Sequence, residues 1–256
     1  MNEHPGYREY MAYGELARTV NAVLAPNLDE LLRTLDAPRH DPTLAVELFQ
    51  NMYRPDAREA YERAVTQRLH NYVAGSATLV DHTRRLMKDR TGLIADEFAR
   101  RKDETLANPE LPFIKDLRNF VLHRTHPFLA HTVRIESADG PAVGEVELSV
   151  VDLLAWAKWS ASTRGFIETQ GDSFPIRPIA LRHGELMVRL HNWLHNELAK
   201  ANAADLADAN ALQEERNAVL AGIDDPVAAR RLTEAITKQR ESPKPIRADL
   251  SDIKRS

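Results

Sequence analysis

Residues 113–127 read FIKDLRNFVLHRTHP, and this stretch decides how the chain is interpreted. Its apolar residues recur at the spacing of one face of an α-helix, which would anchor that helix in a core. Asn119 and His123 are i and i+4 neighbours, and Arg118 lies beside Asn119. Pro127 ends the helix soon after His123. The segment therefore predicts an amphipathic helix that turns a guanidinium, an amide and an imidazole toward a groove, a partner or a second copy.

These three side chains suit chemistry on RNA. The 2′-hydroxyl of RNA is a nucleophile beside the scissile phosphate, so an enzyme must remove its proton, stabilise the developing charge and protonate the leaving oxygen. Histidine suits the proton transfers because its unperturbed pKa is about 6.5. Arginine suits the phosphate because its planar fork donates two parallel hydrogen bonds and stays charged. We expect no metal or other cofactor, and we expect Lys115, Arg124 and His126 to assist substrate binding.

The residues from Arg118 to His123 match an R-x4-H pattern with a polar residue directly after the arginine, and the chain thereby resembles the HEPN superfamily of small helical domains. The resemblance covers the motif and, more loosely, residues 53–198. It implies a metal-independent endoribonuclease in which Arg118 and His123 of two protomers meet across a homodimer interface, with Asn119 positioning them. It also implies a role in a bacterial stress or phage-defence system.

Two alternatives stay open. Many HEPN-like domains serve as non-catalytic binding or dimerisation modules, and any amphipathic helix can carry Arg, Asn and His on its polar edge. His191 and His195 stand at i and i+4, a spacing that binds one metal ion when a third ligand such as His82 or His70 approaches. Asn192 occupies the position where a metalloprotease motif has glutamate, so that version fails. We favour surface or hydrogen-bonded histidines at these positions.

Composition limits the function classes. The chain has 256 residues, no cysteine and a formal net charge of −4. The lack of cysteine excludes disulfide scaffolds, thiolate zinc sites and cysteine nucleophiles. The negative charge leaves RNA binding to local basic patches, of which residues 84–90, 100–102 and 115–124 are candidates. Acidic neighbours favour a solvated helix face of mixed charge for the first two. No apolar run is long enough to span a membrane and the first residues lack a signal peptide, so we expect a cytoplasmic protein whose partner is RNA or a protein that the sequence does not name.

The predicted fold is mainly α, a HEPN-like helical bundle with an inserted β-hairpin and with helical extensions at both ends. Residues 1–40 are the N-terminal extension, with a break at Ala25-Pro26, residues 41–200 are the bundle, and residues 201–256 are an exposed helix followed by a flexible charged tail. The predicted bundle helices lie within residues 56–90, 93–123, 151–170 and 179–198.

Three local features refine this prediction. Gly75 and Ser76 in the middle of the first long helix permit close packing or a bend. The apolar pattern changes to alternation at about residues 131–150, around Asp139-Gly140-Pro141, which predicts the hairpin. The tryptophans at 156, 159 and 193 lie at helical spacing among leucines, so they are expected in the core more than against nucleic-acid bases.

Overall fold

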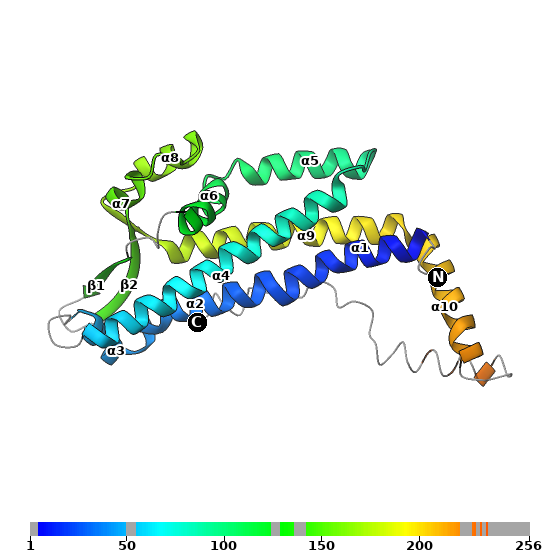
Figure 1. Cartoon of the computed structure of the whole chain (residues 1–256), viewed down its shortest axis with the longest axis horizontal. Coiled ribbons are helices and arrows are strands. Elements are labelled where there is room, and N and C mark those ends of the chain that lie inside the picture. Colours follow the sequence, from blue (N-terminus) through cyan, green and yellow to red (C-terminus); the bar gives the residue numbers. More distant parts are fainter. Residues whose placement is uncertain are drawn as a thin grey trace.

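Long helices lie side by side in an elongated body (Figure 1). The computed structural model describes residues 5–49, 55–123, 129–135, 142–220, 227–228, 231 and 234. The first part of the chain forms α1 Pro5–Thr19, the π-helical turn η1 Val20–Leu24, α2 Ala25–His40, α3 Pro42–Phe49, α4 Pro55–Met87, α5 Leu93–Leu106 and α6 Glu110–His123. The second part forms β1 Leu129–Ile135, β2 Ala142–Ser149, α7 Val150–Leu154, α8 Ala161–Glu168, β3 Ser173–Pro175, α9 Ile176–Ala201 and α10 Ala203–Leu220. The chain is mainly α with a small β element, as predicted.

Helices α1 and α2 contribute buried side chains to the core of the bundle. Helix α1 contacts α4 and α9, and α2 contacts the same two helices. Leu16, Leu24 and Leu28 are fully buried. The predicted break at Ala25-Pro26 is wrong, because the five-residue π-helical turn η1 joins α1 to α2 without leaving helical backbone angles. Pro26 directly follows this turn and has no N–H to donate to a carbonyl in the turn before it.

Two glycines set how closely the long helices approach. A Cβ on Gly75 of α4 would lie 3.1 Å from Val23 Cγ1, which confirms the close packing predicted at that position. A Cβ on Gly184 of α9 would overlap the Leu28 side chain of α2 and lie 3.6 Å from the Tyr72 hydroxyl of α4. Glycine at each position therefore lets α2, α4 and α9 cross in direct contact.

The predicted hairpin is confirmed. Strands β1 and β2 pair antiparallel from Leu129 opposite Leu148 to Ile135 opposite Ala142. The short strand β3 adds a third member, which the sequence pattern did not predict, with Phe174 opposite Leu148. The turn at residues 139–141 lies outside the described residues. Helix α9 begins directly after β3, so the sheet closes one end of the bundle.

The single helix predicted over residues 151–170 is wrong. Two short helices, α7 and α8, take its place, and the chain between them turns so that Trp156 and Trp159 are both buried. The Trp159 indole N–H donates to the Leu153 carbonyl at 2.6 Å, and the Ser160 side chain caps α8. In the turn between the two helices the indole rings of Trp156 and Trp159 meet edge-on, with their centroids 4.7 Å apart.

The C-terminal part confirms an exposed helix. Helix α10 packs against α1 and is mostly exposed, with Ala209 as its buried contact. The predicted flexible tail lies outside the described residues. Within the described ranges, none of the helices has the length and apolar character needed to span a bilayer.

Candidate functional site

Helix α6 carries the motif, and a cluster of aromatic rings fixes its rotation. Phe120 stacks on Trp159 with ring centroids 5.3 Å apart and meets Trp156 edge-on at 5.4 Å. Phe113, two turns earlier, contacts Phe166 at 5.4 Å. Aromatic pairs of this kind add to the burial of the rings themselves. The opposite edge of α6 is thereby held in one orientation toward solvent.

Of the predicted site residues, Lys115, Arg118 and Asn119 lie on that outer side of α6. The side chains of Arg118 and Asn119 are half-buried, and Lys115 is exposed. No hydrogen bond or salt bridge joins Arg118 to any other residue that the structure describes. His123 is the last residue of α6, with its side chain outside the described residues, as are Arg124 and His126 in full.

The helical positions show which of these residues share a direction. At about 100° per residue, positions 119 and 123 differ by about 40° around the axis and lie on the same edge. Positions 118 and 123 differ by about 140°, with Lys115 between them. The predicted closeness of the amide and the imidazole positions therefore holds, whereas the arginine position flanks the opposite side of the same polar face.

Asp116 is a buried aspartate on α6 that was not predicted from the sequence. Asp116 Oδ2 accepts hydrogen bonds from the Ser160 hydroxyl at 2.6 Å, the Thr163 hydroxyl at 2.7 Å and the Ser160 N–H at 3.2 Å. These bonds tie α6 to the beginning of α8. The signal in the sequence was an acidic residue on the apolar face of a helix, which rarely occurs without partners. Asp116 is therefore a positioning residue for α6.

Buried histidines line the inner face of α9. The Nδ1 of His183 lies 2.5 Å from the Tyr72 hydroxyl, and its Nε2 lies 3.4 Å from Ser76 Oγ. The Nε2 of His191 lies 2.9 Å from Thr83 Oγ1, while its Nδ1 donates to the Met187 carbonyl at 2.6 Å. Burial lowers the pKa of His183 to about 3 and that of His191 to about 4. Both rings are therefore neutral at pH 7, and their hydrogen bonds join α9 to α4.

This geometry does not support a metal site at His191 and His195. Both ring nitrogens of His191 already have protein partners, as predicted for a hydrogen-bonded histidine. His82, a suggested third ligand, has its Nδ1 2.8 Å from Thr19 Oγ1. His195 is buried with no hydrogen-bond partner at Nε2, and its ring meets Tyr13 edge-on. Across the described part of the chain, no three potential ligand side chains gather.

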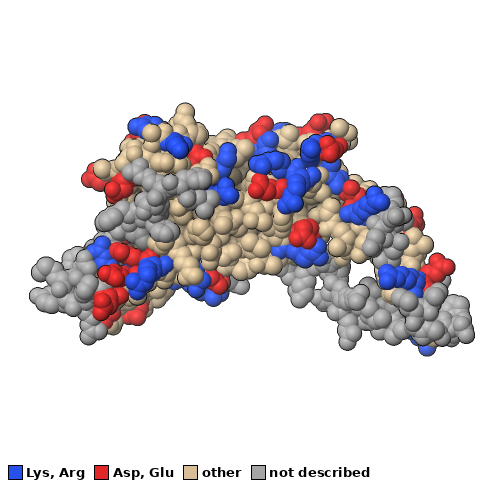
Figure 2. All heavy atoms as spheres, viewed as in Figure 1, with Lys and Arg blue, Asp and Glu red and all other residues tan. Residues whose placement is uncertain are grey.

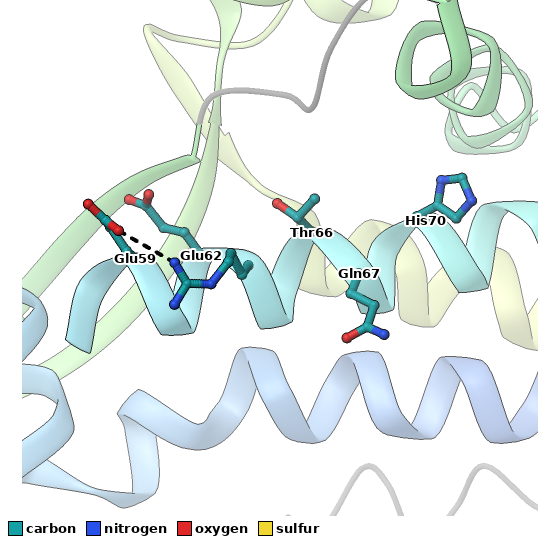
Figure 3. Close-up of a pocket in the computed structure, with 6 residues that line it drawn as sticks. Glu59, Glu62, Thr66, Gln67 and His70 are labelled. Atoms are coloured by element: carbon teal, nitrogen blue, oxygen red, sulfur yellow. Dashed lines mark hydrogen bonds and ion pairs between the residues drawn. The ribbon is translucent and has the colours of Figure 1, made fainter. Parts of the chain in front are cut away.

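An open groove of about 740 Å³ runs along α4 (Figure 3). Glu59, Glu62, Thr66 and His70 point to one side of the helix and Gln67 to the other. Arg63 pairs with Glu59 at 3.4 Å, so the arginine in this groove is neutralised. The groove does not include the motif residues, and its paired charges give it no preference for a phosphate.

The protein is mainly α-helical and has a small antiparallel β-hairpin. Comparison with models of protein families, with characterised proteins and with solved structures finds no match for this chain. No family is identified, and the HEPN resemblance rests on the motif of α6 alone.

Proposed function

We propose that the chain is a metal-independent endoribonuclease that acts as a homodimer, with Arg118 and His123 as its catalytic pair. The observation that carries this proposal is the state of Arg118. Many arginines on these helices form salt bridges with Asp or Glu, including Arg84, Arg100 and Arg164. Arg118 has no such partner among the described residues, and its helix is fixed by buried aromatic rings. A half-buried guanidinium without a carboxylate suits a phosphate.

The reaction follows from the residue types. The imidazole takes the proton from the RNA 2′-hydroxyl, whose oxygen then forms a bond to the adjacent phosphorus. The bond from phosphorus to the 5′-oxygen breaks, and that oxygen receives a proton from the protonated imidazole. The products are a 2′,3′-cyclic phosphate and a 5′-hydroxyl. Arg118 stabilises the charge that develops on the phosphoryl oxygens, and Asn119 orients the imidazole.

The separation of positions 118 and 123 supports a site built from two copies. Because the two positions diverge by about 140° around α6, one helix directs them to different sides. Two α6 helices packed across a symmetry axis would bring the arginine of one copy toward the histidine of the other. Lys115, Arg124 and His126 would then flank the RNA on both sides of the shared cleft.

The test is an RNA-cleavage assay with a chelator present. We expect Arg118→Ala and His123→Ala each to abolish cutting and to leave the circular dichroism spectrum and the oligomeric state unchanged. The matched controls are Arg100→Ala on α5 and His40→Ala at the end of α2, both exposed and outside the motif. Product ends should carry a cyclic phosphate.

Equal activity of His123→Ala and wild type would overturn the assignment of the catalytic pair. A wild-type protein that binds RNA or a protein partner without cutting any RNA would identify the non-catalytic module of the same fold. The setting in stress response or phage defence follows from the resemblance and is proposed with the activity.

A further inference from the structure

Trp193 on α9 differs from the other two tryptophans. Trp156 and Trp159 are 8% and 7% exposed, whereas Trp193 lies at the edge of the core and is only partly buried. The guanidinium carbon of Arg101 on α5 lies 4.6 Å from the centroid of the Trp193 ring. A guanidinium over an indole face is held by a cation–π attraction. The pair therefore joins α5 to α9 at the surface of the bundle.

Two contacts hold the guanidinium of Arg101 in place. Trp193 supports it from one face, and its Nε donates to Glu97 Oε1 at 2.7 Å. Hydrogen bonds from Arg100 and then from Arg101 lower the pKa of Glu97 to about 2, so this carboxylate stays charged. The Arg101 side chain is nevertheless 40% exposed. A fixed, exposed guanidinium plane is a surface on which an unpaired nucleic-acid base stacks.

The outer face of α9 continues this site. Arg189 precedes Trp193 by one helical turn, is exposed, and forms no salt bridge with a described residue. Asn196 follows Trp193 on the same face and is also exposed. Helix α9 carries four Arg or Lys residues against two Glu. Figure 2 shows Lys and Arg side chains, interspersed with acidic ones, over α5 and the adjoining part of α4.

The same face extends toward the motif helix. Helix α6 contacts both α5 and α9. Burial raises the pKa of Glu110 at the start of α6, and the nearby charge of Arg182 on α9 opposes that increase. The outer face of α9 therefore reaches the helix that carries Arg118. A single-stranded nucleic acid bound along α9 would therefore extend to α6.

We infer that the α5–α9 face formed by Arg101, Arg189 and Trp193 binds single-stranded RNA, with a base stacked on the guanidinium of Arg101 and a phosphate held by Arg189. The inference rests on the proposed function for its choice of RNA. Single strands expose the bases that a duplex hides, and proteins bind them by combining stacking with cationic side chains. We favour RNA over a protein partner because the exposed side chains of Arg101, Arg189 and Asn196 are charged or amide groups.

The test is a fluorescence titration with a 2′-O-methyl oligouridylate, which binds as a single strand but lacks the attacking hydroxyl. We expect the oligonucleotide to quench tryptophan emission, and Trp193→Phe to remove the response, because the other two tryptophans are buried. Arg101→Ala should weaken binding about tenfold, the loss of one stacked base. Arg189→Ala should reduce the salt dependence by about one phosphate contact.

The matched control is Arg100→Ala. Arg100 is the neighbouring residue on α5, is paired with Glu97 and Glu104, and does not contact an aromatic ring among the described residues. Equal effects of Arg100→Ala and Arg101→Ala would overturn the inference, as would the absence of quenching. Equal binding of polyglutamate at the same charge concentration would also overturn it, since that would show an ordinary polyanion effect or a protein-binding surface.

Cleavage assays on the same variants separate this inference from the proposed function. If wild type and Arg101→Ala cut RNA with the same KM, the RNA-binding role of the α5–α9 face is wrong and the proposed nuclease activity stands. If the protein never cuts RNA but binds it in a way that depends on Arg101, the RNA-binding role of the α5–α9 face stands and the proposed nuclease activity is wrong.

Discussion

Acid should destabilise this protein at a higher pH than its carboxyl groups alone would require, because burial lowers the pKa of His183, His191 and His195. The pKa of His183 is about 3 and that of His191 is about 4 in the folded chain, in each case lowered by burial. Both values lie below the unfolded value of about 6.5. The unfolded chain therefore binds more protons than the folded chain at any pH between these values. The free energy of unfolding is highest above pH 6.5 and falls as the pH drops toward 4.

The size of the effect follows from linkage. One histidine that is protonated only in the unfolded chain lowers the free energy of unfolding by about 1.4 kcal/mol for each pH unit below its unfolded pKa. At pH 5 each of the two rings therefore removes about 2 kcal/mol, and both together about 4 kcal/mol. A loss of that size is a large part of the total stability of an ordinary domain.

The assay is urea unfolding followed by circular dichroism at pH 7, 6 and 5. His191→Gln retains a hydrogen-bonding side chain next to Thr83 and removes one titrating ring, so the fall of its unfolding free energy should be shallower than that of wild type by about 1.4 kcal/mol for each pH unit below 6.5. His40→Ala, which changes an exposed histidine, is the control and should leave the slope unchanged. A wild-type free energy of unfolding that stays constant from pH 7 to pH 5 would refute the reasoning.

Two further predictions concern the packing of the helices. Gly184→Ala should lower the free energy of unfolding by about 1–3 kcal/mol, because the added methyl group overlaps Leu28 at the helix crossing; Gly165→Ala, where the added group meets nothing within 4 Å, should leave stability unchanged or raise it slightly in the same urea titration. Asp116→Ala should cost about 1–3 kcal/mol by removing the acceptor of three hydrogen bonds from α8, and a thermal-unfolding midpoint equal to that of wild type would show that this network does not hold α6.

The elements that depend on local pattern could be predicted from the sequence. The helices around Asp56–Met87 and Ile179–Leu198 follow from the spacing of their apolar residues. The hairpin follows from alternation on both sides of a turn signal. The close packing of η1 and α2 could not be predicted in the same way, because the glycines that they approach, Gly75 and Gly184, belong to other helices. Helix propensity predicts where a helix forms, but it does not predict which other helix will pack against it.

The residues of the candidate site also differ in whether local spacing could predict them. Arg118 and Asn119 were found because they stand within six residues of His123, where periodicity alone places them. Asp116 was missed because its partners lie on α8, beyond an entire hairpin. The Arg101 and Trp193 pair was missed for the same reason, since a contact between distant helices leaves no spacing in the sequence.

If α6 cuts RNA and the α5–α9 face binds it, as we propose, the two activities should be separable by mutation. Arg118 stands on a helix held by aromatic rings, whereas Arg101 stands on α5, which has no fully buried residue. Loss of the Arg118 guanidinium should therefore reduce kcat, since it removes stabilisation of charge that develops only in the transition state. Loss of the Arg101 guanidinium should raise KM and leave kcat unchanged, since in our proposal Arg101 binds a base and does not contact the scissile phosphate. The reverse pattern, with kcat reduced by Arg101→Ala, would place the chemistry on the α5–α9 face and not on α6.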